Sequence, residues 1–413
     1  MAVNINQLFK NIRPTNVFRS LQYRNYKLYF IGQGISLIGT WMQRMAVSWL
    51  VYTLTHSAFM LGVVTFAGQI PSFILSPYAG VITDKYNKYH ILLITQVAAM
   101  IQAGILATIV LTGHYNITAI LTLSVMLGII NAFDVPSRQS MINNLIEKRE
   151  DLPNAIALNS TMVNLARLLG PVAAGVILAE FGEGICFLLN AISFIAVIIC
   201  LLYMRIPYEP VKKSNNNVWI DFKEGFIYLK NNAPIRRMII LLGLISLIMM
   251  PFSTLLPVFA KDVFKGNAGT FGLLNGTMGA GALTGALYLA ASSSAKLKFK
   301  VVLFTIFLFG SSILLFACTT FLPLALFFIA STGIGMMMFM ATGNTYLQTN
   351  VSDQMRGRVM SFYAMAFFGM MPIGSFFIGM LAEYTSAATT LKIEGITGIL
   401  IATIFTRQVL VKR

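Results

Sequence analysis

Charged side chains are scarce in this sequence. Asp, Glu, Lys and Arg supply 11% of its 413 residues, whereas a soluble domain carries about 25%. Hydrophobic residues supply 57% of the chain, and the mean hydropathy is +0.75. Such a chain has more apolar surface than a water-soluble core could bury, so we expect its surroundings to be membrane lipid.

Acidic residues are the rarer charged class, with 14 against 30 basic residues and a formal net charge of +16. A positive excess of this size can indicate nucleic-acid binding. Here, however, the basic residues form short clusters between apolar runs rather than one basic face of a domain. No nucleic-acid partner is therefore expected.

Two further absences argue against a disulfide framework, a metal site and ATP hydrolysis. The cysteines Cys186, Cys200 and Cys318 lie in or near apolar runs and lack metal-ligand spacing, which argues against a disulfide framework or a metal site. The chain has no phosphate-binding loop of the G-x-x-x-x-G-K-S/T kind, so we do not expect it to hydrolyse ATP. We expect no enzymatic activity and no cofactor.

Long apolar runs recur along the chain, each near the length of about 20 residues that crosses a bilayer as an α-helix. Twelve such runs are separated by polar breaks: Tyr26–Leu54, Met60–Ile82, Ile91–Leu111, Ile117–Val135, Ala155–Phe181, Ile185–Met204, Met238–Phe259, Thr270–Ala290, Val301–Ala317, Pro323–Leu347, Val359–Ala382 and Gly395–Thr406. We therefore expect an all-α membrane protein with twelve transmembrane helices.

The basic residues indicate how these helices are oriented. Nearly all of them fall in alternate breaks beginning with the N-terminus, and the opposite breaks hold only Lys261, Lys265 and Lys392. Because cytoplasmic loops carry the excess of Lys and Arg, both termini are expected to be cytoplasmic.

A polar stretch at 205–237 divides the apolar runs into an N-terminal bundle at 1–204 and a C-terminal bundle at 238–413. Gly170–Phe181 and Met371–Tyr384 share an early proline, a later glycine and a Leu-Ala-Glu-aromatic ending. The similarity is what a duplicated six-helix unit would produce.

The polar stretch itself has a helical pattern. Trp219, Phe222, Phe226 and Leu229 recur at helical spacing among charged residues. This pattern predicts an amphipathic helix on the inner membrane face, where it would bind anionic lipid headgroups and tether the two bundles.

The break after the second run reads G-V-I-T-D-K-Y-N-K from Gly80 to Lys88. It resembles the G-x-x-x-D-R/K-x-G-R/K signature of major facilitator superfamily transporters. Other stretches resemble exporters of that superfamily similar to the enterobactin exporter and the macrolide-efflux permeases. They are G-T-W-M-Q-R with W-L-V-Y within 39–52, F-D-V-P-S-R-Q at 133–139, N-A-I-A-L-N with R-L-L-G-P within 154–171, and R-G-R-V-M-S at 356–361.

The resemblance implies two pseudo-symmetric six-helix bundles that rock around a central cavity, in a monomer of the bacterial inner (cytoplasmic) membrane. In that family the Gly80–Lys88 loop helps to latch the cytoplasmic gate, which would place Asp84 near Arg356 and Arg358. The gating residues expected on this basis are Gly80, Asp84, Lys85, Lys88, Asp134, Arg138, Arg356 and Arg358.

The chain departs from the family pattern in places. Lys85 and Lys88 replace the usual arginines, and Asn87, which suits a turn with positive φ, replaces the second glycine. The equivalent signature between the eighth and ninth runs has no Asp. Gly170-Pro171 with Gly175 resembles a helix motif associated with exporters, although close packing of small residues is ordinary in membrane helices.

Arg44 and Arg167 lie well inside predicted spans, where an arginine costs at least about 2.5 kcal/mol unless it meets water, a carboxylate or carbonyls. One hypothesis is that they attract an anionic substrate. The alternative is structural, with each guanidinium satisfied by backbone carbonyls or by amides such as Gln43 and Asn164. The full set of expected substrate-binding residues is Arg44, Gln43, Gln33, Asn131, Asn164, Arg167 and Asn344.

Proton coupling in a transporter commonly uses a carboxylate within the membrane. The candidates are Asp134, near the inner end of its run, and Glu180 and Glu383, near outer ends. No acidic residue is expected at the depth of the two arginines.

The sequence therefore favours a secondary exporter of small amphipathic organic molecules, driven by protons and working by alternating access. Buried positive charge favours siderophore-like or other anionic metabolites as substrates. A multidrug or macrolide efflux pump, a non-transporting membrane receptor on the same fold and an importer remain alternatives, because a fold does not identify a substrate.

Overall fold

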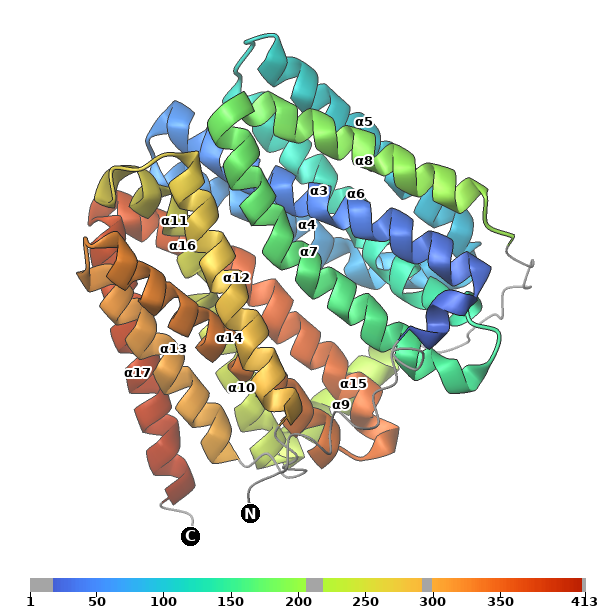
Figure 1. Cartoon of the computed structure of the whole chain (residues 1–413). Helices are drawn as coiled ribbons and strands as arrows, with labels where there is room; N and C mark the ends of the chain where they lie inside the picture. The colour runs from blue at the N-terminus through green and yellow to red at the C-terminus, as the bar shows by residue number, and fades with distance from the viewer. Residues whose placement is uncertain (1–17, 206–217, 292–298, 411–413) are drawn as a thin grey trace.

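The computed structural model describes residues 18–205, 218–291 and 299–410, and these residues are almost entirely helical. The prediction of an all-α protein is confirmed. Figure 1 shows helices α3–α8 gathered on one side of the molecule and α10–α17 on the other.

Six long helices follow one another in the first part of the chain. They are α3 (Arg24–Thr55), α4 (Ala58–Lys85), α5 (Lys88–Leu111), α6 (Ile117–Met141), α7 (Leu152–Phe181) and α8 (Glu183–Leu202). Short 3₁₀ turns, η1 (Arg19–Gln22), η2 (Ile142–Asn144) and η3 (Arg149–Asp151), precede α3 and join α6 to α7. α3 packs on α7 and α8, α5 packs on α6 and α8, and α4 packs on α6.

The second part of the chain has less regular helices. It contains α10 (Ala233–Ile248), α12 (Ala268–Ala291), α13 (Phe299–Cys318), α14 (Leu322–Asn350), α15 (Asp353–Ala364), α16 (Met370–Tyr384) and α17 (Ala387–Leu410). α14 packs on α12 and α13, and α13 also packs on α17. The contacts between the two parts are mainly those of α4 with α16 and of α7 with α12.

The seventh predicted run, Met238–Phe259, is not one regular helix. It is divided into α10, the 3₁₀ helix η4 (Met250–Leu255), a single turn α11 (Leu256–Val258) and the π-helix η5 (Phe259–Val263). Pro251 and Pro257 fall inside this run, and each lacks the backbone N–H that a regular helix needs. A second π-helix, η6 (Met365–Gly369), joins α15 to α16.

The last predicted run was placed too late in the sequence. Gly395 was expected to begin it, but α17 begins at Ala387 and therefore contains Lys392 and Glu394. The predicted run therefore left out a buried acid, Glu394, which lies inside this helix.

Ten helical segments within the described residues are long and apolar enough to cross a membrane. The other two predicted runs form α3 and α12, helices of 32 and 24 residues that pack within the molecule. We call the end of the molecule where α3 begins and α8 ends the linker end. The opposite end, with the turns at His56 and Thr385, is the far end.

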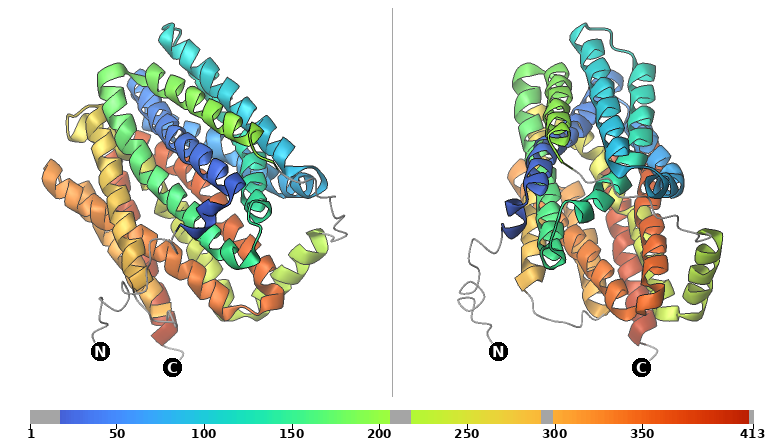
Figure 2. Two further views of the ribbon diagram at one scale, coloured as in Figure 1. Left: turned by 45° about the vertical axis from the view of Figure 1, so that its right-hand side comes forward. Right: turned by 90° about the vertical axis from the view of Figure 1, so that its right-hand side faces the viewer.

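The amphipathic helix predicted near the middle of the chain is present as α9 (Val218–Asn231). Figure 2 shows it at the edge of the molecule beside α15. The rings of Phe222 and Phe362 lie 4.8 Å apart, and Leu229 is buried. Part of the apolar face of α9 therefore packs against α15.

The turn after α4 differs from expectation at Asn87. Its φ is −65°, not positive, and its side chain accepts a hydrogen bond from the Tyr89 N–H at the start of α5. Asn87 therefore acts as a helix N-cap, one of the preferred roles of asparagine.

Candidate functional site

A cavity of about 120 Å³ lies among α3, α5, α6, α7 and α8. Its polar lining residues are Gln33, Ser36, Thr40, Arg44, Gln96, Asn131, Asp134 and Arg138, together with the indole of Trp41. A pocket with several convergent polar groups among apolar walls is typical of a small-molecule site. The structure therefore brings predicted substrate-binding residues and two predicted gating residues, Asp134 and Arg138, to one cavity.

Trp41 holds two positive charges close together. The Arg44 Cζ lies 4.9 Å from the centroid of the Trp41 ring, and the Arg167 Cζ lies 5.2 Å from it. Cations within about 6 Å of an indole are attracted by its electron-rich face. Two guanidinium groups, one from α3 and one from α7, thus meet at a single aromatic side chain.

These arginines lack acidic partners in the part of the chain that the structure describes, where the recorded ion pairs include neither of them. Arg44 is an exposed residue although it lies well inside α3, and it lines the cavity. The Arg167 Nε is buried without a hydrogen-bond partner among the described residues. An anion would satisfy both groups, because guanidinium binds carboxylate and phosphate oxygens with paired hydrogen bonds.

A glycine allows the two arginines to meet. A Cβ added at Gly170 would lie 2.5 Å from the Trp41 Cβ and 3.0 Å from the Ile38 carbonyl oxygen. Only glycine lets α7 approach α3 this closely, one turn after Arg167. On the other side of α7, a Cβ at Gly175 would lie 2.7 Å from the Gly272 Cα of α12. The expectation that this glycine motif permits close helix packing is confirmed.

Asp134 and Arg138 form a polar network on the cavity wall. The Asp134 carboxylate lies 3.7 Å from the Arg138 guanidinium and accepts hydrogen bonds from Thr95 (3.1 Å) and Gln96 (2.6 Å). Arg138 in turn donates to the Gln33 Oε1 at 3.3 Å. Asp134 thus lies in a spanning helix beside a cation, and its predicted roles in gating and proton coupling stay predictions.

The predicted amide ligands are in different environments. Gln43 donates to Gln102 at 2.9 Å and accepts from Asn190 at 2.7 Å, which links α3 to α5 and α8. The Asn164 amide donates to the Ser160 carbonyl of its own helix. The structural alternative for Arg44 and Arg167 named backbone carbonyls or amides such as Gln43 and Asn164, and these hydrogen bonds of Gln43 and Asn164 go to other groups. Asn344 lies in α14 and accepts from Gln348.

The predicted gating arginines have partners at the linker end. Arg356 pairs with Asp353, and Arg358 lies 2.6 Å from the Glu224 carboxylate of α9. Asp84 is in the last turn of α4 with Lys85, but its side chain falls outside the described residues, so the predicted Asp84 contact stays a prediction. Lys88 is the first residue of α5, and Gly80 has open space around its Cα.

Two hydrogen-bonded contacts between the two parts of the chain lie at the far end, where no gate was predicted. The Tyr52 hydroxyl of α3 donates a hydrogen bond to Asp262 of η5. The Glu383 carboxylate of α16 accepts from the Ser57 hydroxyl at 2.9 Å and from the Phe59 N–H at 3.1 Å, at the start of α4. Glu180 is exposed at the end of α7.

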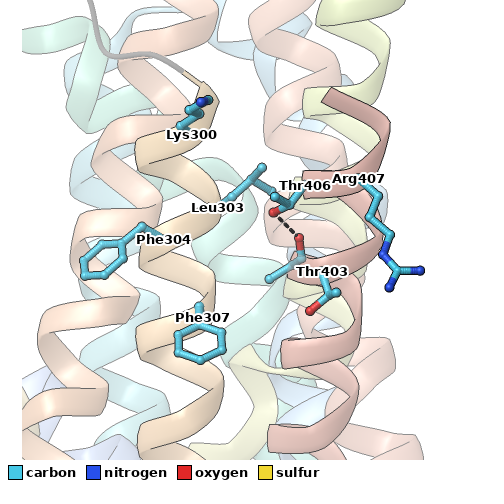
Figure 3. A pocket seen from close by; sticks show the side chains of 8 residues that line it. Lys300, Leu303, Phe304, Phe307, Thr403, Thr406 and Arg407 are labelled. Atoms are coloured by element: carbon cyan, nitrogen blue, oxygen red, sulfur yellow. Dashed lines mark hydrogen bonds between the residues drawn. The ribbon is translucent and has the colours of Figure 1, made fainter. Parts of the chain in front are cut away.

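A larger groove of about 400 Å³ lies elsewhere, between α13 and α17. Figure 3 shows Phe304 and Phe307 along it, with Lys300 and Arg407 near its linker end. Phe304 is 61% exposed, as expected for a helix surface that faces lipid. This groove contains none of the predicted substrate-binding residues.

The chain is similar to bacterial transporters along most of its length. The chain is 32% identical over 386 residues to the staphyloferrin A transporter of Staphylococcus aureus, covering 92% of this chain and 95% of that protein. It is 21% identical over 373 residues to macrolide efflux protein A of Streptococcus pyogenes, covering 88% and 91%.

Solved transporter structures share the fold. The nucleoside transporter NupG matches with a TM-score of 0.71 at 16% identity, over 94% of this chain and 98% of that one. A bacterial homologue of the human lysosomal transporter Spinster matches with a TM-score of 0.71 at 14% identity, over 92% and 95%.

A model of the transmembrane secretion effector family matches residues 15–413. The predicted resemblance to exporters of the major facilitator superfamily is thereby confirmed, as is the prediction of a membrane transporter rather than an enzyme. The chain belongs to the transmembrane secretion effector family of the major facilitator superfamily.

Proposed function

We propose that this protein is a proton-coupled secondary exporter of small anionic metabolites, with siderophore-like chelators as the favoured class. The observation that carries the proposal is the pair of guanidinium groups of Arg44 and Arg167 over Trp41. An unpaired cation inside a membrane protein is costly and is retained where it has a function. Two of them at Trp41, whose side chain lines the cavity, favour a substrate with more than one anionic group.

The surrounding polar groups would complete this site. Gln33, whose Nε2 is buried without a partner among the described residues, would donate to a substrate oxygen, as would Asn131 on the same cavity wall. The Asp134–Arg138 pair lies next to Gln33. An anion bound near Arg138 would compete with Asp134 for the Arg138 guanidinium and weaken their ion pair. Substrate binding would in this way affect the conformation of α6, which carries both residues.

The proposed architecture has twelve spans in two pseudo-symmetric bundles, 1–204 and 238–413, joined by the cytoplasmic linker at 205–237. Both termini would be cytoplasmic, in a bacterial inner membrane. Transport would proceed by rocking of the two bundles against each other, with the substrate held in the cavity of the first bundle. The far-end contacts of Tyr52 with Asp262 and of Glu383 with Ser57 support a state closed toward the outside.

Macrolide efflux is the second candidate, supported by the similarity to macrolide efflux protein A. The two candidates differ in the charge of the substrate. A neutral or cationic macrolide gains little from two guanidinium groups, whereas a polycarboxylate gains paired, charge-assisted hydrogen bonds. The arginines therefore favour the anionic class.

Comparison of secreted metabolites from the parent strain and a strain lacking this gene tests the proposal. We expect the mutant culture medium to lose an anionic iron-chelating compound and the cells to accumulate it. Sensitivity to erythromycin should stay unchanged. Unaltered secretion together with greater erythromycin sensitivity would replace the proposal with macrolide efflux.

A further inference from the structure

Glu394 is a buried acid that the site described above does not use. It lies inside α17 and is 3% exposed. Both of its carboxyl oxygens are buried without a hydrogen-bond partner among the described residues. Within those residues, no Lys, Arg or His forms an ion pair with it.

The neighbouring helices supply no nearby charge at this depth. α17 packs on α10, α13, α16 and η4. The ionisable residues of these elements lie near their ends: Arg236, Arg237, Lys300, Cys318, Glu383 and Tyr384. On α17 itself, Lys392 lies two positions away, on the opposite side of the helix. An ionised carboxylate here would be an uncompensated buried charge, so the packed state accommodates the neutral acid.

The face of α17 that carries Glu394 packs against the irregular part of the seventh run. Gly398 lies one turn further along this face, and a Cβ added there would lie 2.4 Å from the Met249 Sδ. Met249 is the last residue before η4, where the helix changes to a 3₁₀ and then a π conformation. Such irregular backbone in membrane helices is common at functional sites.

This irregular segment, Met250–Val263, leads to the far-end contact. It contains Asp262, which accepts the hydrogen bond from Tyr52 of the first part of the chain. The segment also contacts α3, α4 and α16. A change in how α17 packs on Met249 can therefore reach the contact between Tyr52 and Asp262 through one continuous stretch of chain.

From this arrangement we infer that Glu394 carries the proton that drives export, an inference that rests on the proposed function. When the far end is open, the Glu394 carboxylate takes a proton from hydronium and leaves water. The neutral acid then permits dry packing of α17 on Met249 and closure at Asp262. With the far end closed, the acid gives its proton to water that reaches it from the linker end; the carboxylate must then be hydrated, and the packing loosens.

Two measurements on the reconstituted full-length protein test this inference. Infrared titration should show the carbonyl stretch of a protonated carboxylic acid at a pH where exposed acids are ionised. Glu394→Gln should remove this band, whereas Glu180→Gln should keep it. In liposomes, Glu394→Gln should lower the accumulation of staphyloferrin A driven by a pH gradient at least tenfold, while exchange of labelled for unlabelled staphyloferrin A continues.

A band that survives Glu394→Gln, or gradient-driven accumulation within twofold of the parent protein, would overturn the role of Glu394. If the Gln variant does not fold, Glu394→Asp is the deciding variant. Its accumulation of substrate should still be driven by the pH gradient, with a shifted pH profile. An unshifted pH profile would count against the inference. Failure of the proposed function looks different, because the parent protein itself would then show neither exchange nor accumulation.

Discussion

The Tyr52 hydroxyl donates a hydrogen bond to the Asp262 carboxylate and so joins residues 210 positions apart in the chain. The Lys261 ammonium lies 6.0 Å from the centre of the same tyrosine ring. One tyrosine of α3 thus meets an anion and a cation of the irregular segment that follows α10. We regard this contact as part of a gate that closes the far end.

Tyr52→Phe should weaken this gate. A hydrogen bond to a charged group is worth about 1.5–3 kcal/mol, so the population open at the far end should rise roughly tenfold or more. Distance distributions between spin labels at Tyr115 and Tyr384, which are exposed at the far end on opposite parts of the chain, would report the change. An unaltered distribution would show that this bond does not hold the gate.

Gly62→Ala should separate α4 from α16. An added Cβ would lie 2.5 Å from the Ser375 carbonyl oxygen and 3.1 Å from the Gly379 Cα, and overpacking of this kind costs about 1–3 kcal/mol. We expect the same increase in far-end opening from the same spin labels. The matched control is Gly104→Ala, because nothing lies within 4 Å of that Cβ position. Equal effects of the two substitutions would contradict the prediction.

Glu383→Ala should also favour the open far end. It removes the acceptor for the Ser57 hydroxyl and the Phe59 N–H, and loss of such a cap costs about 1 kcal/mol. Labelling of a cysteine placed at Phe59 by a membrane-impermeant maleimide should therefore become several-fold faster. Glu180→Ala is the control, since Glu180 is an exposed acid at the same end of another helix.

Glu224→Ala should have little effect on stability. Its ion pair with Arg358 is half exposed, with side-chain exposures of 49% and 29%, and such pairs contribute about 0–1 kcal/mol. Denaturation in detergent should shift by only a few degrees. A much larger loss would show that α9 holds α15 in place chiefly through this pair rather than through the Phe222–Phe362 contact.

The sequence predicted most of the long helices because apolar runs and charged breaks are local properties. The predictions were wrong where the local composition did not reflect the local structure. Lys392 and Glu394 make the start of α17 look like a loop, so the helix was placed too late and its buried acid was missed. The break after α10 was missed because a run with prolines stays apolar whether its backbone is regular or not.

The site was predictable only in part. Arg44 and Arg167 were recognised because an arginine inside an apolar run is conspicuous. Their meeting at Trp41 was not, because it depends on how closely α7 approaches α3, and that distance is set by Gly170 against the Trp41 Cβ. The far-end gate joins residues from distant parts of the chain, which no local pattern reveals.

Gly170→Ala should therefore impair transport indirectly, although the residue at position 170 does not contact the substrate in the proposed site. The added methyl group would collide with Trp41 and move Arg167 away from it. With staphyloferrin A, named for a relative, as the probe of the proposed site, we expect the KM for exchange in liposomes to rise roughly tenfold, the effect of about 1.4 kcal/mol. An unchanged KM in a folded variant would separate the glycine from the substrate site.

The most direct test of the proposed site uses staphyloferrin A, named for a relative, as a probe anion. Its binding is measured by calorimetry with the purified parent protein and with Arg44→Gln, Arg167→Gln and Lys300→Gln. Loss of a charge-assisted hydrogen bond costs about 1.5–3 kcal/mol, so each of the first two variants should bind roughly tenfold or more weakly. Lys300→Gln, in the separate groove between α13 and α17, should bind as the parent does. Binding that is unchanged in Arg44→Gln and Arg167→Gln, with both proteins folded, would contradict an anion site at Trp41.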